Sequence, residues 1–398
     1  MIEFEDNNFT IEVAWFYSGK DEPVPNVAME VVDGEIADIR SIRHTDSSLA
    51  IIPPLVNAHT HLELSDVSPP IPAGSTFPDW IRKVIGHRAS RENPTHAVEV
   101  GLREVEAAAT LRVADTVPMA QTAHLPATRL YPNRFVEYIG LDDRRVADAI
   151  EHVNIWPRSG FHWGAHSGIS PHAPYSVRLD LLDTLVATAA RTYRAVMMHI
   201  AETREELELL ERGTGPMAQM LQDFDVWEPG LFPTRSVCEF IECLSAAPQV
   251  LLAHANYFSE REIDLAASLS NVNVVYCPRT HAHFGHEPHP WRQMLERGLN
   301  VALGTDSRAS NPDLSIWNEA AYLHRTTDAG PVLALDMATR HGSLALIGQP
   351  EHVVVDGSAT FSLLQCQSPQ TEFFAELFDA FSPVAVCDDG AWVRPGNS

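Results

Sequence analysis

The sequence predicts an α/β protein, a (β/α)8 TIM-type barrel with a small β-sandwich domain formed by the N- and C-terminal segments. Over residues 53–350, short apolar runs alternate with longer amphipathic stretches, which is typical of parallel strands joined by helices. Both ends of the chain carry short alternating runs, and neither end has enough of them to bury a core alone. No glycine-rich phosphate loop occurs, which disfavours the alternative of a doubly wound sheet that binds a nucleotide.

The terminal segments, residues 1–52 and 351–398, are expected to pack together as one composite β-sandwich, with the barrel inserted between them. In the first segment, Asp33-Gly34 separates two alternating runs, and this dipeptide is a strong signal for a tight hairpin. The second segment has comparable runs, at residues 353–355, 360–364 and 384–393.

The barrel region contains several expected strands and helices. The expected strands are residues 135–139, 164–169, 195–200, 250–253, 272–276 and 301–303. The expected helices are residues 96–109, 178–193, 205–212, 260–268 and 290–297. A further strand at residues 50–56 is interrupted by Pro53 and Pro54.

The composition is that of an ordinary globular protein, with 45% hydrophobic and 20% charged residues. A formal charge of -25 argues against nucleic acid and anionic membranes as partners, because phosphates would be repelled. The N-terminus does not resemble a signal peptide, and no run of about eighteen apolar residues occurs, so we expect a cytoplasmic protein. The 5 cysteines lack CxxC spacing, so neither a disulfide framework nor a thiolate zinc site is indicated. The expected partner is a small-molecule substrate, and a homodimer stays an open option.

Two histidines separated by one residue, His59 and His61, follow the strand expected at residues 50–56. Because residues i and i+2 of a strand point the same way, both imidazoles can face one ion. His199 and Asp306 stand at the ends of two later strands. Each of these residues alone is more often structural, but three histidines and one aspartate at successive strand ends predict a Zn²⁺ site, with Fe²⁺ as the alternative.

Two more side chains are expected beside this metal ion. Glu202 lies three residues after His199, and a glutamate there can take a proton from water and deliver it to a leaving group. Its alternative role is that of an acid at the start of the following helix. His254 follows the strand at residues 250–253, where it can hydrogen-bond the reacting water.

Lysine usage predicts a single ion. Binuclear metal hydrolases on such barrels can bridge two ions with a carboxylated lysine, but the only lysines are Lys20 and Lys83. Neither lies at a central strand end, so we expect one ion.

Six motifs in order span nearly the whole chain: Asn57-Ala58-His59-Thr60-His61, Ser170-Pro171-His172-Ala173-Pro174, His199-Ile200-Ala201-Glu202-Thr203, Leu252-Ala253-His254-Ala255, Cys277-Pro278-Arg279-Thr280 and Gly304-Thr305-Asp306-Ser307. With them the sequence resembles the amidohydrolase superfamily, in the branch of mononuclear zinc aminohydrolases that includes purine and pyrimidine deaminases and triazine chlorohydrolases. This resemblance implies that His59, His61, His199 and Asp306 bind one Zn²⁺. It implies catalytic roles for Glu202, His254 and Asp306, and a substrate-binding role for His172.

Within this branch, His61-Leu62-Glu63-Leu64-Ser65 and the segment Phe77-Pro78-Asp79-Trp80-Ile81-Arg82 are similar to aminodeoxyfutalosine deaminases of the alternative menaquinone pathway. The resemblance implies that Glu63, Trp80 and Arg88 contact the substrate. Glu63 has an equally good structural interpretation at the start of a loop, and Trp80 could belong to the core.

The leading functional hypothesis is hydrolytic deamination of a purine-like aminated heterocycle, with aminodeoxyfutalosine as one candidate substrate. A chlorohydrolase or a cyclic-amide hydrolase on the same fold is the alternative, because the metal and water are indifferent to the leaving group. A non-catalytic scaffold is a remote alternative, since such relatives lose metal ligands.

Overall fold

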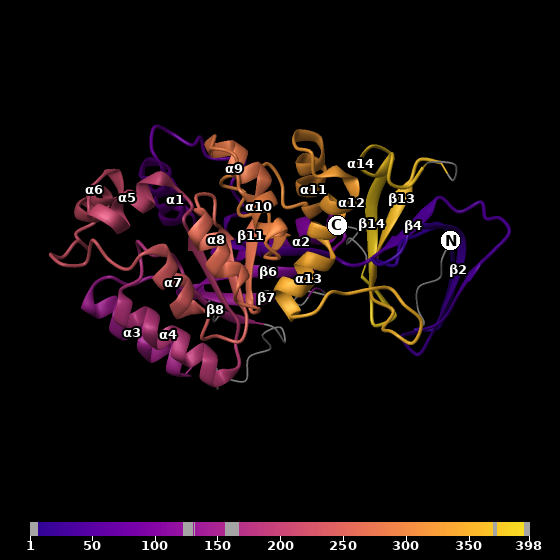
Figure 1. The fold of residues 1–398 in the computed structure, drawn as a ribbon, viewed down its shortest axis with the longest axis horizontal. Coiled ribbons are helices and arrows are strands. Elements are labelled where there is room, and N and C mark those ends of the chain that lie inside the picture. The colour runs from indigo at the N-terminus through magenta and orange to yellow at the C-terminus, as the bar shows by residue number, and fades with distance from the viewer. Residues whose placement is uncertain (1–6, 122–129, 131, 156–166, 369–371, 394–398) are drawn as a thin grey trace.

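The computed structural model describes residues 7–121, 130, 132–155, 167–368 and 372–393. Within these residues the chain forms two parts, a barrel of strands and helices from the middle of the chain and a sheet from both terminal segments (Figure 1). The predicted fold class is confirmed. The domain limits at residues 52 and 351 stay predictions.

The terminal segments form one mixed sheet of seven described strands. In spatial order these are β15 (Ala391–Val393), β14 (Phe381–Asp388), β13 (Phe361–Cys366), β4 (Leu49–Ile52), β1 (Phe9–Phe16), β2 (Val24–Val32) and β3 (Glu35–Ser41). The two ends of the chain join where β13 pairs antiparallel with β4. Buried side chains of β2 and β14, which are not neighbours in the sheet, belong to one apolar core, so the sheet curls around it.

The hairpin expected at Asp33-Gly34 is confirmed, since these two residues connect β2 to β3. Both have positive φ, 52° at Asp33 and 83° at Gly34, as the tightest hairpin turns require. The strand expected at residues 353–355 is wrong, because this segment pairs with no strand. Only Val353 is buried in the core, and the segment turns at Asp356 instead of continuing along the sheet.

The barrel contains eight described parallel strands. In spatial order these are β12 (Asn300–Leu303), β11 (Val272–Tyr276), β10 (Val250–His254), β9 (Val196–Ile200), β8 (Gly168–Pro171), β7 (Asn133–Tyr138), β6 (Thr110–Pro118) and β5 (Leu55–Thr60). Each expected barrel strand overlaps one of them, although residues 164–166 lie outside the described residues. The strand expected at residues 50–56 is two strands, because Pro53 and Pro54 separate β4 in the terminal sheet from β5 in the barrel.

The barrel closes between β5 and β12. Thr60 forms a parallel bridge with Asp306, and the backbone N–H groups of Thr305 and Asp306 donate to the His59 carbonyl oxygen at 3.0 and 3.1 Å. The Asn57 side chain adds two bonds, because its Oδ1 accepts from Thr305 N at 3.1 Å and its Nδ2 donates to Thr305 Oγ1 at 2.7 Å. This closure places His59 and Asp306 on neighbouring strands.

Asn57→Ala is expected to lower the free energy of unfolding by about 1–3 kcal/mol, because it removes two buried hydrogen bonds at the closure. Equilibrium urea denaturation of the two proteins measures the difference. Asn154→Ala is the matched control, since Asn154 is exposed and its Nδ2 donates to the Ile150 carbonyl oxygen in its own helix. Equal midpoints for the two variants would contradict the expected role of Asn57.

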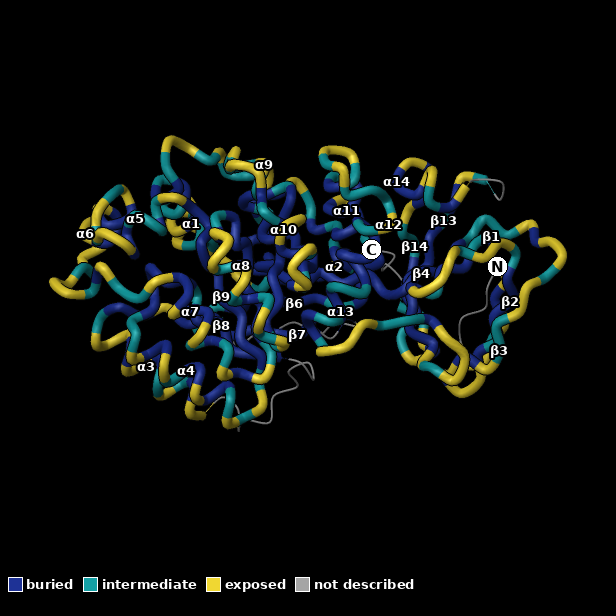
Figure 2. Tube along the Cα trace, in the orientation of Figure 1, coloured by how far each residue is buried: buried dark blue, intermediate teal, exposed yellow. Residues whose placement is uncertain are grey.

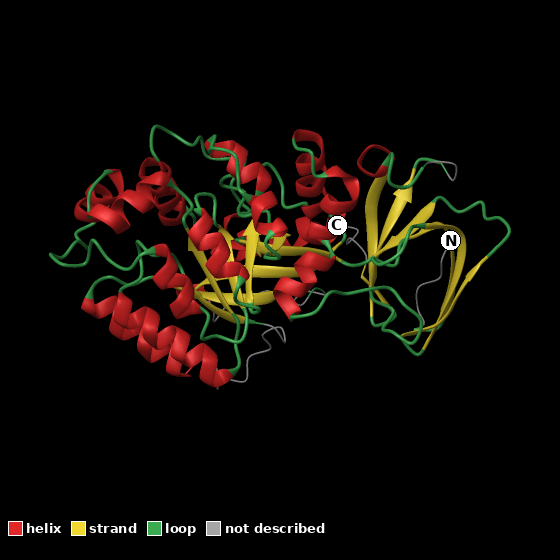
Figure 3. Cartoon of the chain, viewed as in Figure 1, coloured by secondary structure: helices red, strands yellow, loops and turns green. Residues whose placement is uncertain are grey.

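Helices surround the barrel strands, whereas the terminal sheet consists almost wholly of strands (Figure 3). The described helices are α1 (Phe77–Ser90), α2 (Pro94–Ala107), α3 (Asp143–Ile155), α4 (Leu179–Thr192), α5 (Arg204–Arg212), α6 (Pro216–Asp223), α7 (Val237–Leu244), α8 (Glu260–Ala267), α9 (Pro278–Phe284), α10 (Trp291–Glu296), α11 (Ile316–Thr326), α12 (Gly330–Ala338), α13 (Arg340–Ile347) and α14 (Leu377–Ala380). The five expected helices overlap α2, α4, α5, α8 and α10.

Burial follows this arrangement, with the barrel strands enclosed and the outer sides of the helices exposed (Figure 2). Among the described helices, none has the length and apolar character needed to span a membrane.

Candidate active site

The predicted site residues meet at the carboxyl ends of the barrel strands, where parallel strands share one face. The residues that meet there are His59 in β5, His61 directly after it, His199 in β9, His254 at the end of β10, Glu202 just past β9 and Asp306 just past β12. All six are buried.

The four predicted metal ligands form a compact cluster. His61 Nε2 lies 3.2 Å from His199 Nε2 and 3.7 Å from Asp306 Oδ1. His59 Nε2 lies 3.7 Å from the same carboxylate oxygen. Atoms that bind one tetrahedral Zn²⁺ at about 2.0–2.1 Å lie roughly 3.4 Å apart, and these three separations are close to that spacing. Ligand atoms lie within 4.8 Å of one another in two groups that share His59, one with His61 and Asp306 and the other with His199 and His254.

Neighbouring groups hold these ligands in orientations that leave their metal-facing atoms free. His199 Nδ1 donates to the His172 carbonyl oxygen at 2.8 Å, which leaves the lone pair on Nε2. His59 Nε2 is buried without a hydrogen-bond partner among the described residues, an arrangement that a metal ion would satisfy. Asp306 Oδ2 accepts a hydrogen bond from Ser310 Oγ at 2.7 Å, which orients the carboxylate.

Burial also sets the protonation states of this cluster. Burial and the neighbouring histidines hold the pKa values of His59 and His61 well below the usual value, and burial lowers that of His199 to about 4. Metal ions bind the neutral form of imidazole. Burial raises the pKa of Asp306 to about 7, so its negative charge is costly without a nearby cation. The donor set and its charge therefore fit a divalent cation.

Glu202 and His254 form a second pair beside this cluster. Glu202 Oε1 lies 3.5 Å from His254 Nε2. Burial raises the pKa of Glu202 well above its usual value, with further contributions from Asp306 and Glu206. A strongly raised carboxyl pKa in a cavity is typical of a group that transfers protons.

Four residues at these strand ends adopt the left-handed backbone region, with φ of 48° at Ala201, 71° at His254, 52° at Ala255 and 52° at Asp306. This region is unfavourable for residues with a Cβ atom, and such conformations concentrate at functional sites. They turn each chain segment sharply as it leaves its strand.

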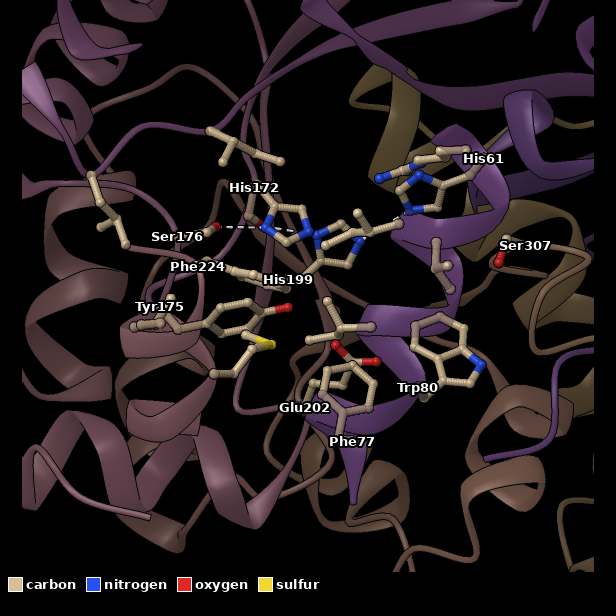
Figure 4. A pocket seen from close by; sticks show the side chains of 18 of the residues that line it. His61, Phe77, Trp80, His172, Tyr175, Ser176, His199, Glu202, Phe224 and Ser307 are labelled. Carbon is tan, nitrogen blue, oxygen red and sulfur yellow. Dashed lines mark hydrogen bonds between the residues drawn. The ribbon is translucent and has the colours of Figure 1, made fainter. Parts of the chain in front are cut away.

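A cavity of about 460 Å³ opens above the cluster. His61, His172, His199 and Glu202 line the cavity (Figure 4), and His254 lines it as well. Its apolar walls come from α1 and from the region of α6, with the side chains Phe77, Trp80, Ile81, Val84, Ile85, Met220, Leu221 and Phe224. Trp80, a predicted substrate contact, therefore lies in the wall. Its ring stacks on the Phe77 ring, with the two ring centroids 5.5 Å apart.

His172 borders the same cavity from the loop after β8. Its Nδ1 lies 2.6 Å from Ser176 Oγ. Its ring packs against the Tyr175 ring in a T-shaped arrangement, with the two ring centroids 5.6 Å apart. Burial lowers the pKa of His172 to about 3, so the ring is neutral. The structure thus places this predicted substrate contact beside His199, one of the predicted metal ligands.

Arg88 and Glu63 are brought together, but only Arg88 lines the cavity. Glu63 is buried, and its carboxylate accepts from Arg88 Nε at 2.8 Å and from Arg91. Sequence reasoning did not include Arg91. Glu63 therefore lies behind Arg88 and away from the cavity surface, where it holds the Arg88 guanidinium in place.

Sequence reasoning also missed Ser310 and Glu206, which orient Asp306 and the turn at Glu202. A signal for Glu206 was present, because Thr203-Arg204-Glu205-Glu206 has the spacing of a helix capping box. No local signal marks Ser310.

A sequence profile described as the amidohydrolase family matches residues 50–348. The chain belongs to the amidohydrolase family. The resemblance predicted from the six motifs is confirmed.

Relatives within the amidohydrolase family include two named deaminases. The chain is 26% identical over 346 residues to the 5-methylthioadenosine/S-adenosylhomocysteine deaminase of Pyrococcus furiosus, an alignment that covers 81% of this chain and 76% of that protein. It is 30% identical over 289 residues to the aminodeoxyfutalosine deaminase of Deinococcus radiodurans, covering 68% of this chain and 67% of that protein. The crystal structure of Helicobacter pylori aminofutalosine deaminase superposes with a TM-score of 0.82, at 19% identity, over 97% of this chain and 100% of that chain. This last likeness shows the shared fold.

Proposed function

We propose that the protein is a metal-dependent hydrolytic deaminase of a purine-like aminated heterocycle. The observation that carries this proposal is the buried pair of Glu202 and His254, 3.5 Å apart, which opens with the histidine–aspartate cluster onto one cavity. The names of the two deaminase relatives support the same class of reaction.

We assign the metal to His59, His61, His199 and Asp306, and propose one Zn²⁺, with Fe²⁺ as the other candidate. Nitrogen and oxygen donors of this kind suit both ions. When bound, such an ion acts as a Lewis acid that makes a water molecule reactive near neutral pH.

Glu202 carries the protons in this proposal. It takes a proton from the attacking water and transfers it to the ring nitrogen beside the carbon that bears the amine, as a C–O bond forms at that carbon. The ring C=N double bond opens to a tetrahedral centre. Glu202 then moves the proton of the added hydroxyl to the amine, the C–N bond breaks, and ammonia leaves behind a ring carbonyl.

His254 orients the oxygen that adds to the ring. Burial holds its pKa well below the usual value, so the ring is neutral and can both donate and accept a hydrogen bond. The His254 carbonyl oxygen accepts from His289 Nε2 at 2.8 Å, which steadies the strand end that carries the imidazole.

The cavity indicates a substrate larger than a free base. Its volume of about 460 Å³ falls within the range of about 300–1,000 Å³ that is usual for drug-sized ligands. We therefore propose a nucleoside whose purine faces His172 and Glu202, with an apolar extension against α1 and α6. Aminodeoxyfutalosine is the first candidate, because it appears in the name of the Deinococcus relative.

Ammonia release tests this proposal. The zinc-loaded protein is assayed with aminodeoxyfutalosine, methylthioadenosine, S-adenosylhomocysteine, adenosine and adenine, together with a chlorinated triazine and a cyclic amide. Turnover fastest on a substituted adenine nucleoside is expected. Turnover only of the triazine or the amide would replace the proposal by the chlorohydrolase or amide-hydrolase alternative.

Arg88→Met is expected to lower kcat/KM about 10–100-fold, which corresponds to one charged hydrogen bond of about 1.5–3 kcal/mol to the substrate. Steady-state kinetics on the best substrate measures the change. Arg82→Met is the matched control, because Arg82 lies on the same helix but binds Asp223 instead of lining the cavity. A similar loss in both variants would indicate damage to α1 and contradict a substrate contact.

A further inference from the structure

Glu206 is a fully buried carboxylate in the first turn of α5, four residues after Glu202. It does not line the cavity, so it is outside the direct reach of a substrate there. Both of its oxygens are bonded to the backbone, since Oε1 accepts from Ala201 N and Oε2 accepts from Glu202 N, each at 2.9 Å. The side chain therefore binds the two peptide groups that lead into Glu202.

These bonds differ from those of an ordinary helix cap. Thr203 caps α5 and its Oγ1 accepts from Glu206 N at 3.2 Å, which is the first half of a capping box. In a capping box the glutamate carboxylate returns to the N–H of the cap residue itself. The Thr203 N–H also lowers the pKa of Glu206, as a capping-box contact would, but the two short hydrogen bonds of its carboxylate reach the two residues before Thr203, so it acts on the turn as well as on the helix.

The turn needs such support. Ala201 has φ of 48°, in the left-handed region that residues with a Cβ atom avoid. On the other side of the turn, Asn256 Nδ2 donates to the Glu202 carbonyl oxygen at 3.0 Å. The backbone of Glu202 is thus bonded at its N–H by Glu206 and at its carbonyl by Asn256.

Burying a carboxylate is costly, and burial raises the pKa of Glu206 to about 7 against the opposing effect of the backbone N–H groups. Its carboxylate offers one acceptor oxygen to each of the two peptide N–H groups, whereas a neutral glutamine offers only one acceptor oxygen in all. The fixed geometry of the turn is the gain that accounts for it.

We propose that Glu206 is a positioning residue that fixes the backbone of Glu202 and so keeps the Glu202 carboxylate beside His254. The proposal rests on the proposed function in one respect, since it takes Glu202 as the group that moves protons. It does not depend on which leaving group departs.

The test compares Glu206→Ala and Glu206→Gln with wild type, on whichever substrate the wild-type protein turns over fastest. Misplacement of a reacting group by about 1 Å can cost about 10²-fold in rate, so Glu206→Ala is expected to lower kcat by about that factor. Glu206→Gln keeps one acceptor oxygen and should fall between Glu206→Ala and wild type. KM and the metal content should stay at wild-type levels. Glu208→Gln is the matched control on the same helix, because it makes the same change at a carboxylate that accepts a hydrogen bond from Thr214 and does not line the cavity, and it should leave kcat unchanged.

Adding Glu206→Ala to a Glu202→Gln protein should cause no further loss of kcat, because Glu206 acts through Glu202. Unchanged kcat in Glu206→Ala would overturn the proposal. Loss of metal in parallel with kcat would also overturn it, because Glu206 would then support the end of β9 and His199. If Glu206→Ala does not fold, the kcat and metal content of the nearly isosteric Glu206→Gln decide between these outcomes.

Failure of the proposed function has a different signature. Fast turnover of a chlorinated or cyclic-amide substrate would change the assigned reaction and still permit every comparison above. If the wild-type protein turned over no compound, a crystal structure of zinc-loaded Glu206→Gln would decide the matter. A Glu202 carboxylate displaced from His254 supports the positioning role, and an unmoved carboxylate overturns it.

Discussion

Replacing Glu202 by glutamine is expected to lower kcat by about 10²–10⁴-fold, the usual contribution of a general acid–base group. Glutamine has nearly the same shape but cannot take or return a proton. Steady-state ammonia release measures the loss, and elemental analysis should find the metal content unchanged. Glu211→Gln is the control, because Glu211 is an exposed carboxylate on α5.

Full activity of Glu202→Gln with the metal bound would remove Glu202 from the mechanism. Loss of the metal together with the activity would instead make Glu202 a metal ligand. The position of Glu202 favours the proton-carrying role, because its carboxylate lies 3.5 Å from His254 Nε2 and lines the cavity, within reach of a bound substrate.

Removing a metal ligand should have the second large effect. Loss of a residue that only supports a metal ligand usually weakens metal binding about 10–100-fold. His59→Ala is expected to weaken metal binding more than that and to abolish turnover. His59 is fully buried and its Nε2 has no hydrogen-bond partner among the described residues, so the ion is its expected partner. Mass spectrometry of the purified protein and thermal unfolding with and without chelator measure both effects.

Asp306→Asn is the isosteric companion to His59→Ala, since it removes the charge while keeping the shape. His96→Ala is the control, because the His96 side chain is 60% exposed on α2. The thermal midpoints of His59→Ala and Asp306→Asn should not respond to added zinc, because ligand binding stabilises only a protein that retains the site. A full equivalent of metal in His59→Ala would contradict the assigned ligand set.

The proposed metal ligands were accessible to sequence reasoning for a physical reason. Strand periodicity and the position of catalytic residues at the ends of barrel strands are local and general rules, so His59, His61, His199 and Asp306 could be selected without coordinates. The structure places His61 beside His199 and Asp306, and His59 beside Asp306. The hairpin at Asp33-Gly34 was predictable in the same way, because two positive φ values favour that dipeptide.

Other features depend on contacts between distant segments. The pairing of β13 with β4 joins residues about three hundred positions apart, as the partners Leu363 and Ile51 show. The proline pair was read as an interruption of one strand, whereas it marks the passage from one sheet to another. The apolar run at residues 353–355 looked like a strand because valines are common in strands. A loop that buries one valine has the same local sequence, so composition alone could not tell the two apart.

The cavity wall shows the same division. Trp80 and Arg88 were selected by resemblance, and the structure adds that α1 carries both of them to a cavity that residues of α6 also line. Residue spacing in the sequence could not predict that Arg88 and Arg91 hold Glu63. These ion pairs depend on how α1 packs over the loop after β5.

The sequence by itself determined the family, the alternation of strands and helices, and the side chains able to hold one metal ion beside an acid. Tertiary structure alone decided how wide the cavity is, which charged groups face it, and that Glu206 binds the turn before Glu202. Periodicity and motifs report which chemistry a segment carries, since they depend on neighbouring residues in the chain. Volume, ion pairing and backbone support depend on the packing of segments that sequence order leaves far apart.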